Sequence, residues 1–183
     1  ELSYVGQPFA VVLAQGKGAA QRGADAIWAD CSELAPWLDH DESADEVASV
    51  AHRSGSAPPD AACTVRARQD QPRVVAMALE PRAMLVAWDE PAQCLKAWIP
   101  TQTPWRARAD IARLLGLSPN QVQVIAPDVG GAFGSRSSLG PEELLLAWVA
   151  HSRKCALKWT ASRSEEFTSG MHGRGTRLQG QLS

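Results

Sequence analysis

The most informative stretch of the sequence is Val124-Ile125-Ala126-Pro127-Asp128-Val129-Gly130-Gly131-Ala132-Phe133-Gly134-Ser135-Arg136. An apolar, strand-like segment leads into a glycine-dense turn, and a helix start at Pro141-Glu142-Glu143 follows. Glycines allow positive φ and admit a ligand where a Cβ would block it. Strand, loop and helix in this order present backbone amides to an anion or to the polar end of a cofactor. The alternative is a tight connection between two core elements.

Nucleotide binding is a weaker hypothesis for this loop. The loop lacks the Gly-Lys-Ser/Thr ending of a phosphate-binding P-loop, and it does not fit the spacing G-x-G-x-x-G of a dinucleotide-binding turn.

Composition limits the classes of partner. The chain has 183 residues, of which 45% are hydrophobic, enough for one well-filled domain or two small ones. A net charge of -2 gives no general attraction to nucleic acid or to anionic lipid. No run approaches the roughly 18 apolar residues of a membrane-spanning helix, and the first residues lack the order of a signal peptide. We expect a soluble, cytoplasmic protein with no nucleic-acid or membrane partner.

Two sets of residues are candidates for metal ligands. Cys31, Cys63, Cys94 and Cys155 lie far apart and form no C-x-x-C pair, so they indicate buried thiols rather than a zinc or iron-sulfur site. His40 lies between two aspartates, which invites a metal site. Adjacent loop residues rarely converge on one ion, and we favour a solvated acidic turn. No metal ligand is predicted.

The first part of the chain predicts a small β-α-β unit. Residues Phe9–Ala14 form a short apolar run typical of a buried strand, and small residues recur at helical spacing from Lys17 to Ile27. A second strand is expected over Trp28–Leu34. Polar and Pro/Gly-rich residues then predict a linker over 39–61.

The second part alternates strands with helices. Strands are expected over Thr64–Gln69, Gln121–Ala126, Cys155–Thr160 and Thr176–Leu182, with a hairpin of Ala83–Trp88 and Leu95–Ile99. A helix over Trp105–Leu115 has an apolar face of Ala107, Ile111, Leu114 and Leu115, and Gly116 suits a left-handed cap. A second helix covers 141–152. Ser162 and Glu165 have capping-box spacing for a short helix to about Ser169. The fold class is α+β, a mixed arrangement of helices and strands.

Four segments, taken together, resemble the large, molybdopterin-binding subunit of the molybdenum hydroxylases, the xanthine dehydrogenase, aldehyde oxidase and aerobic carbon monoxide dehydrogenase group. They occur in the family's order and cover most of the chain: Tyr4–Val12, Leu79-Glu80-Pro81-Arg82-Ala83, Thr101-Gln102-Thr103-Pro104 with the helix ending at Leu117, and Asp128–Arg136. The resemblance implies three parts: residues 1–38 as the end of an α/β hammerhead, 39–61 as linker, and 62–183 as the first part of the molybdopterin-binding domain.

The resemblance also implies a cofactor site. In the family the glutamine of the Thr-Gln motif hydrogen-bonds an oxygen on molybdenum, which assigns that role to Gln102. The loop residues Gly131, Ala132, Phe133 and Gly134 would lie beside the pterin and the metal. Without the resemblance, Gln102 would be taken as a strand-end side chain that caps the helix after it.

Departures from the family pattern limit the expected activity. Ala132 replaces a usual glycine, Ala76 a common histidine, and Ser137 stands where xanthine-oxidising members carry a substrate-binding glutamate, which argues against a purine substrate. The family's subunit is several times longer, and the segment that carries the catalytic glutamate has no counterpart here. No catalytic residue is therefore assigned.

We expect a fragment or truncated form that is inactive as an isolated chain and holds no cofactor alone. Its partners would be the remaining large subunit and the iron-sulfur and FAD subunits or domains. The alternative is a non-catalytic binding or assembly module that keeps the fold and self-associates through uncovered apolar surface.

Overall fold

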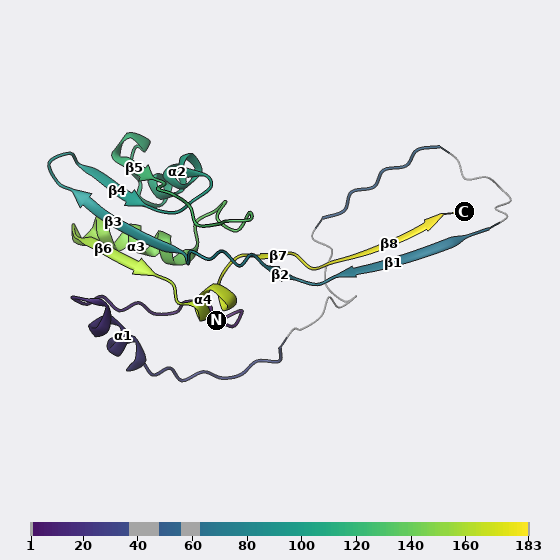
Figure 1. Ribbon diagram of the computed structural model, residues 1–183, viewed down its shortest axis with the longest axis horizontal. Helices are drawn as coiled ribbons and strands as arrows, with labels where there is room; N and C mark the ends of the chain where they lie inside the picture. The colour runs from purple at the N-terminus through teal and green to yellow at the C-terminus, as the bar shows by residue number, and fades with distance from the viewer. Residues whose placement is uncertain (1, 37–47, 56–62, 183) are drawn as a thin grey trace. The chain divides into compact units, whose positions relative to one another are not determined.

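A computed structural model describes residues 2–36, 48–55 and 63–182 (Figure 1). The chain divides into two compact units. Unit 1 consists of Glu1–Ala10 and Asp70–Arg177, and unit 2 consists of Val11–Gln69 and Leu178–Ser183. The glycine loop and all of the predicted cofactor-binding residues belong to unit 1.

A four-stranded mixed sheet forms the centre of unit 1. Its order is β5-β4-β3-β6, with β3 at Ala83–Asp89, β4 at Cys94–Trp98, β5 at Val122–Ile125 and β6 at Ala156–Thr160. Strand β3 pairs antiparallel with β4 and with β6, whereas β4 and β5 are parallel. The predicted hairpin is confirmed, and the pair Asp89–Cys94 closes it. The parallel pair requires a crossover, which the helix α2 (Pro104–Leu115) supplies.

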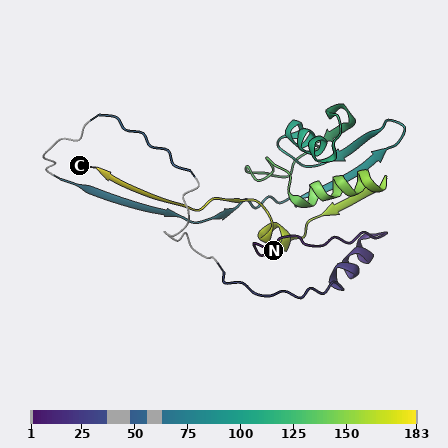
Figure 2. The same ribbon diagram turned by 180° about the vertical axis from the view of Figure 1, so that it is seen from behind.

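One face of this sheet is covered by α2 and α3 (Pro141–Arg153), as the views from both sides show (Figure 2). Alternate residues of each strand point to that face because side chains in a strand alternate with a period of two. Val86 lies opposite Ala97 on one side and Leu157 on the other. The core that results consists of Met84, Val86, Leu95, Ala97, Ile99, Ile111, Ala112, Val122, Leu146, Ala147 and Ala150. The α+β class is confirmed.

The helix α2 ends as predicted, but its apolar face is rotated. Gly116 has a φ of 66° and forms the left-handed cap. Ala107, Ile111 and Ala112 are buried, whereas Leu114 is 49% exposed. The assignment of Leu114 to the core face was therefore wrong, because Ala112 takes the place against the sheet and α3.

Short elements complete unit 1. A 3-10 turn at Pro119–Gln121 leads into β5, and β2 (Val74–Val75) pairs with β7 (His172–Gly173). Helix α4 (Arg163–Thr168) starts with the predicted capping box. The Ser162 hydroxyl accepts from the Glu165 amide at 3.2 Å, and the Glu165 carboxylate accepts from the Ser162 amide at 2.6 Å. Local chemistry alone was enough to place this helix start.

Unit 2 contains α1 (Lys17–Asp25) and most of a two-stranded ribbon of β1 (Val65–Gln71) and β8 (Thr176–Leu182). Gly23 of α1 lies close to Val12, since a Cβ on Gly23 would lie 2.7 Å from Val12 Cγ1, but the helix has no buried residue and Ile27 is 40% exposed. The predicted strands Phe9–Ala14 and Trp28–Leu34 were wrong. Both segments are irregular because no described strand pairs with either of them. The Trp28 side chain is 83% exposed.

Several further expectations concern surface residues. Cys31 and Cys63 are exposed, so the prediction of buried thiols was wrong for these two, while Cys94 and Cys155 are half-buried. Residues 37–47 and 56–62, with His40 and most of the predicted linker, lie outside the described residues. Within the described part, no helix has the length and apolar character needed to cross a membrane. The division of the chain at 38 and 61 stays a prediction.

Candidate cofactor-binding site

The glycine loop follows β5 and takes a backbone path that few residues other than glycine adopt. Gly131, Phe133 and Gly134 have φ values of 104°, 50° and 89°. At Gly131 a Cβ would lie 3.2 Å from Phe133 Cε2, so both the backbone angle and the crowding favour glycine there. Ala132 is buried, whereas Phe133 is 77% exposed. The loop therefore anchors itself through Ala132 and presents an aromatic ring outwards.

Four successive backbone amides of this loop have no partner in the described part of the chain: those of Gly131, Ala132, Phe133 and Gly134. The amides on either side are engaged. Gly130 donates to the Glu80 carboxylate at 2.8 Å, and the Ser135 amide donates to the Ala132 carbonyl at 2.9 Å. Backbone amides need an acceptor. The loop thus offers a row of donors to the acceptor atoms of a ligand.

Gln102 lies beside the end of this loop. Its backbone amide donates to the Arg136 carbonyl at 3.1 Å. The Ser137 hydroxyl is 3.4 Å from Gln102 Oε1 and 2.9 Å from the Gly134 carbonyl. Gln102 is exposed, and it does not cap α2, whose first residues receive no side-chain hydrogen bond from it. The structure therefore brings Gln102 and the loop together.

The threonines on either side of Gln102 fasten its segment to the loop. Thr101 Oγ1 donates to the Arg136 carbonyl at 3.0 Å, and Thr103 Oγ1 donates to the Ser137 carbonyl at 2.9 Å. Thr101 is buried. Two hydroxyls therefore fix the segment in register with the loop.

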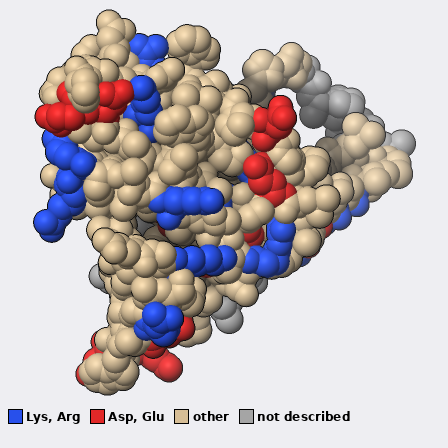
Figure 3. All heavy atoms as spheres, turned by 60° about the vertical axis from the view of Figure 1, so that its left-hand side comes forward, with Lys and Arg blue, Asp and Glu red and all other residues tan. Residues whose placement is uncertain are grey.

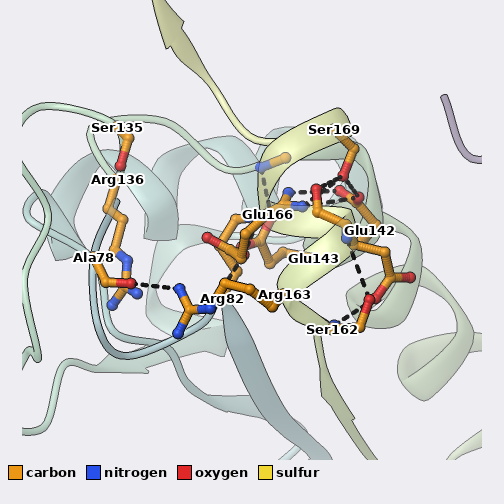
Figure 4. A network of polar contacts seen from close by, with 12 residues as sticks. Ala78, Arg82, Ser135, Arg136, Glu142, Glu143, Ser162, Arg163, Glu166 and Ser169 are labelled. Atoms are coloured by element: carbon orange, nitrogen blue, oxygen red, sulfur yellow. Dashed lines mark hydrogen bonds and ion pairs between the residues drawn. The ribbon is translucent and has the colours of Figure 1, made fainter. Parts of the chain in front are cut away.

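The segment 78–82 joins the loop to the helices (Figure 4). Arg163 donates to the carbonyls of Ala78 and Leu79 at 2.7 Å each. The buried Arg82 pairs with Glu142 and with Glu166, at 3.0 Å in both cases. These contacts hold the starts of β3, α3 and α4 to one another.

Glu143 is a buried carboxyl at the start of α3, 5% exposed. It accepts a hydrogen bond from the Gly140 amide at 2.6 Å, which caps the helix. Burial raises the pKa of Glu143 because desolvation disfavours its charged form, while the charge of Arg82 acts in the opposite direction. It supports the helix start and does not face the exposed side of the loop.

A cavity of about 160 Å³ lies next to the loop, lined by residues that include Arg82, Ser135, Ser138 and Met171. Ligand pockets typically measure about 300–1,000 Å³. A large cofactor would therefore contact the exposed side of the loop rather than this cavity. Among the described residues, no group of three or more His, Cys, Asp or Glu side chains is placed to hold a metal ion.

On the face drawn in Figure 3, Lys and Arg side chains lie interspersed with Asp and Glu side chains.

The resemblance did not assign roles to two residues of the site. Glu80 and Arg136 each lie inside a matching segment, but their contacts with one another join positions 56 residues apart. The available signal was a glutamate and an arginine that each stand inside one of the four segments that resemble the family.

The chain is similar in sequence to known proteins. Residues 40–183 match the family described as the molybdopterin cofactor-binding domain. The nicotine 6-hydroxylase large subunit of Paenarthrobacter nicotinovorans is 29% identical over 185 residues, which cover 92% of this chain and 22% of that protein. The carbon monoxide dehydrogenase large chain of Hydrogenophaga pseudoflava is 26% identical over 126 residues.

Solved structures share the fold. Quinoline 2-oxidoreductase from Pseudomonas putida 86 has a TM-score of 0.63 and 30% identity, over 67% of this chain and 16% of that chain. CO dehydrogenase from Oligotropha carboxidovorans has a TM-score of 0.60 at 24% identity, which bears on the fold alone. The chain spans less than a quarter of the length of the curated relatives it matches.

Proposed function

Because the chain belongs to the molybdopterin cofactor-binding domain family, we propose that it is a fragment of a molybdenum hydroxylase large subunit whose glycine loop and Gln102 hold the molybdenum cofactor. The observation that carries this proposal is the row of four unpartnered amides at Gly131–Gly134 beside the exposed Gln102. The bound cofactor would supply the oxidative hydroxylation of an aldehyde, an N-heterocycle or a similar small substrate.

Each residue of the site suits a defined part in holding that group. The loop amides donate to acceptor atoms, and the absence of Cβ at Gly131 and Gly134 allows close backbone approach. The exposed ring of Phe133 can pack against a flat ligand. Gln102 Oε1 lies near the Ser137 hydroxyl, which leaves the Nε2 protons free to donate to an oxygen of the cofactor. An uncharged amide does this without changing the charge of the centre.

We further propose that the isolated chain is inactive and holds no cofactor. The cavity beside the loop measures only about 160 Å³, so the loop forms one side of the proposed cofactor site and does not enclose it. None of the carboxylates of the site can be assigned as the catalytic base. The remaining large subunit would supply the other walls. Iron-sulfur and FAD subunits or domains are the proposed electron partners. The four free cysteines suit a reducing compartment, which supports a cytoplasmic location.

Molybdenum analysis of purified protein tests the proposal. We expect no stoichiometric molybdenum on the isolated chain and stoichiometric molybdenum when the chain is expressed together with the remaining part of the large subunit. In that complete protein, Gln102→Ala should lower hydroxylation by about 10–100-fold, the usual effect of losing an outer partner of a metal centre, with little loss of molybdenum. Gln123→Ala, at an exposed position of β5, is the matched control.

Two outcomes would contradict different parts of the proposal. Stoichiometric molybdenum on the chain alone would contradict the predicted inactivity. A complete subunit that binds no molybdenum would contradict the function itself.

A non-catalytic assembly module is the second candidate, and exposed aromatic side chains favour it. Trp105, Phe133 and Trp148 are all more than half exposed. Large exposed apolar surface marks interaction sites. Light scattering separates the two candidates: concentration-dependent self-association that persists in the complete subunit supports the module, whereas a monomeric chain argues against it.

A further inference from the structure

Arg136 is an arginine with only 5% of its surface exposed, at the end of the glycine loop. Its guanidinium donates to the Glu80 carboxylate at 2.5 Å and to the Glu80 backbone carbonyl. A third acceptor, the Pro100 carbonyl, lies at 3.5 Å. One side chain therefore reaches two segments of the chain that are distant in sequence from the loop.

Glu80 connects this guanidinium to the other end of the loop. The carboxylate oxygen that pairs with Arg136 also accepts from the Gly130 amide at 2.8 Å, and the Glu80 amide donates to the Gly130 carbonyl at 3.2 Å. The contact is close, since a Cβ on Gly130 would lie 2.5 Å from Glu80 Cβ. Gly130, immediately before the unpartnered amides, and Arg136, two residues after the last of them, are thus tied together through one carboxylate.

The backbone of Arg136 forms the link to Gln102. The Arg136 carbonyl accepts from the Gln102 amide and from the Thr101 hydroxyl, at 3.1 Å and 3.0 Å. The same residue is therefore fastened through its side chain to the start of the loop and through its carbonyl to Gln102. Arg136 thus holds Gln102 beside the loop together with Thr103, whose hydroxyl donates to the Ser137 carbonyl.

Glu80 keeps 32% of its side chain exposed while Arg136 keeps 5%, so this ion pair is partly buried. Taking a guanidinium and a carboxylate out of water costs free energy that their attraction often fails to recover, so a pair of this kind is a weak argument for net stability. Arginine suits the position because its planar fork donates in several fixed directions, whereas lysine is a point charge on a flexible stem.

We propose that Arg136 is a positioning residue that sets the shape of the loop Gly131–Gly134 and its distance from Gln102 through the clamp it forms with Glu80. The inference rests on the proposed function for the identity of the ligand. The clamp itself is a property of the chain without any ligand.

Amide hydrogen exchange on the whole chain tests the clamp without cofactor. The Arg136→Lys variant keeps the charge but not the fork. We expect exchange at the Gly130 and Gln102 amides to rise by about tenfold or more, as for a local opening, while amides of the β3–β4 hairpin keep their wild-type rates. Arg113→Lys, which alters an exposed arginine of α2 paired with Asp110, is the matched control and should change neither site.

Glu80→Gln provides a second route if the lysine variant folds poorly. It keeps the size of the side chain and one carbonyl acceptor but removes the charge that attracts Arg136, so exchange at Gly130 should rise here as well. Unchanged exchange at Gly130 and Gln102 in both variants would overturn the proposal. An equal rise over the whole of unit 1 would also overturn it, because Arg136 would then serve general stability.

Molybdenum retention in the complete large subunit gives the functional readout. We expect Arg136→Lys to lose molybdenum several-fold faster than wild type on dialysis, and Arg113→Lys to match wild type. If the wild-type subunit binds no molybdenum, the proposed function fails while the exchange result still decides on the clamp. Loosened exchange with wild-type retention would overturn the link between the clamp and the cofactor.

Discussion

Glu143 is the residue whose burial has the clearest effect on stability. Burial raises its pKa above the value of about 4.3 typical of an unfolded chain. The folded state then binds more protons than the unfolded state as the pH rises from that value through the raised pKa. The contribution of Glu143 to the free energy of unfolding therefore falls over this window.

The Glu143→Gln variant removes this titration and keeps an oxygen that can accept from the Gly140 amide. We expect the free energy of unfolding of the variant, relative to wild type, to increase as the pH rises through the window. Urea denaturation at a series of pH values measures the difference, with the exposed Glu33→Gln as the control. A difference that stays constant with pH would contradict the assignment.

Among the site residues, those predicted from the resemblance were brought together, but their supports were not foreseen. Gln102 and Phe133 lie in segments with recognisable local patterns. The contact of Glu80 with Arg136 depends on how distant segments pack, and such contacts leave no periodicity in a sequence. The cofactor-binding role of Gln102 and of Gly131–Gly134 stays a prediction.

At the scale of the element, α2 shows what periodicity predicts and what it leaves open. Its bounds and its left-handed cap at Gly116 were predicted correctly. Ala112 lies one residue after Ile111 and Leu114 three residues after it, so the two flank Ile111 on opposite sides of the helix, and the apolar face could extend to either side. Because α3 packs against α2, the smaller side chain of Ala112 takes the buried position. The sequence of α2 alone does not show which helix packs against it.

This difference gives a paired prediction for α2. Ile111→Ala should lower the free energy of unfolding by about 2–5 kcal/mol, because it leaves a cavity in a fully buried position. Leu114→Ala should cost less than about 1 kcal/mol, because its side chain is half exposed. Chemical denaturation compares the two variants. Equal losses of the free energy of unfolding in the two variants would indicate that Leu114 lies in the core and would contradict the packing described above.

At the scale of the whole molecule, sequence patterns predicted the sheet strands of unit 1, and in unit 2 they predicted α1, β1 and β8. In unit 1 each expected strand of the sheet found a partner, and the apolar faces of strands and helices meet in one core. The segments Phe9–Ala14 and Trp28–Leu34 have strand-like composition without a described partner. Strand formation depends on pairing, so composition alone overestimated it there.

The order β5-β4-β3-β6 also bears on the kinetics of folding. Strands β3 and β4 are neighbours in sequence, whereas β6 reaches β3 only after the glycine loop and α3, across the longest stretch of chain in the sheet. Contacts that close long stretches form late. We expect Leu157→Ala in β6 mainly to accelerate unfolding and Leu95→Ala in β4 mainly to slow refolding, as measured by stopped-flow fluorescence. If the loop holds a cofactor, as proposed, the protein would complete the sheet that carries this loop in the last step of its assembly.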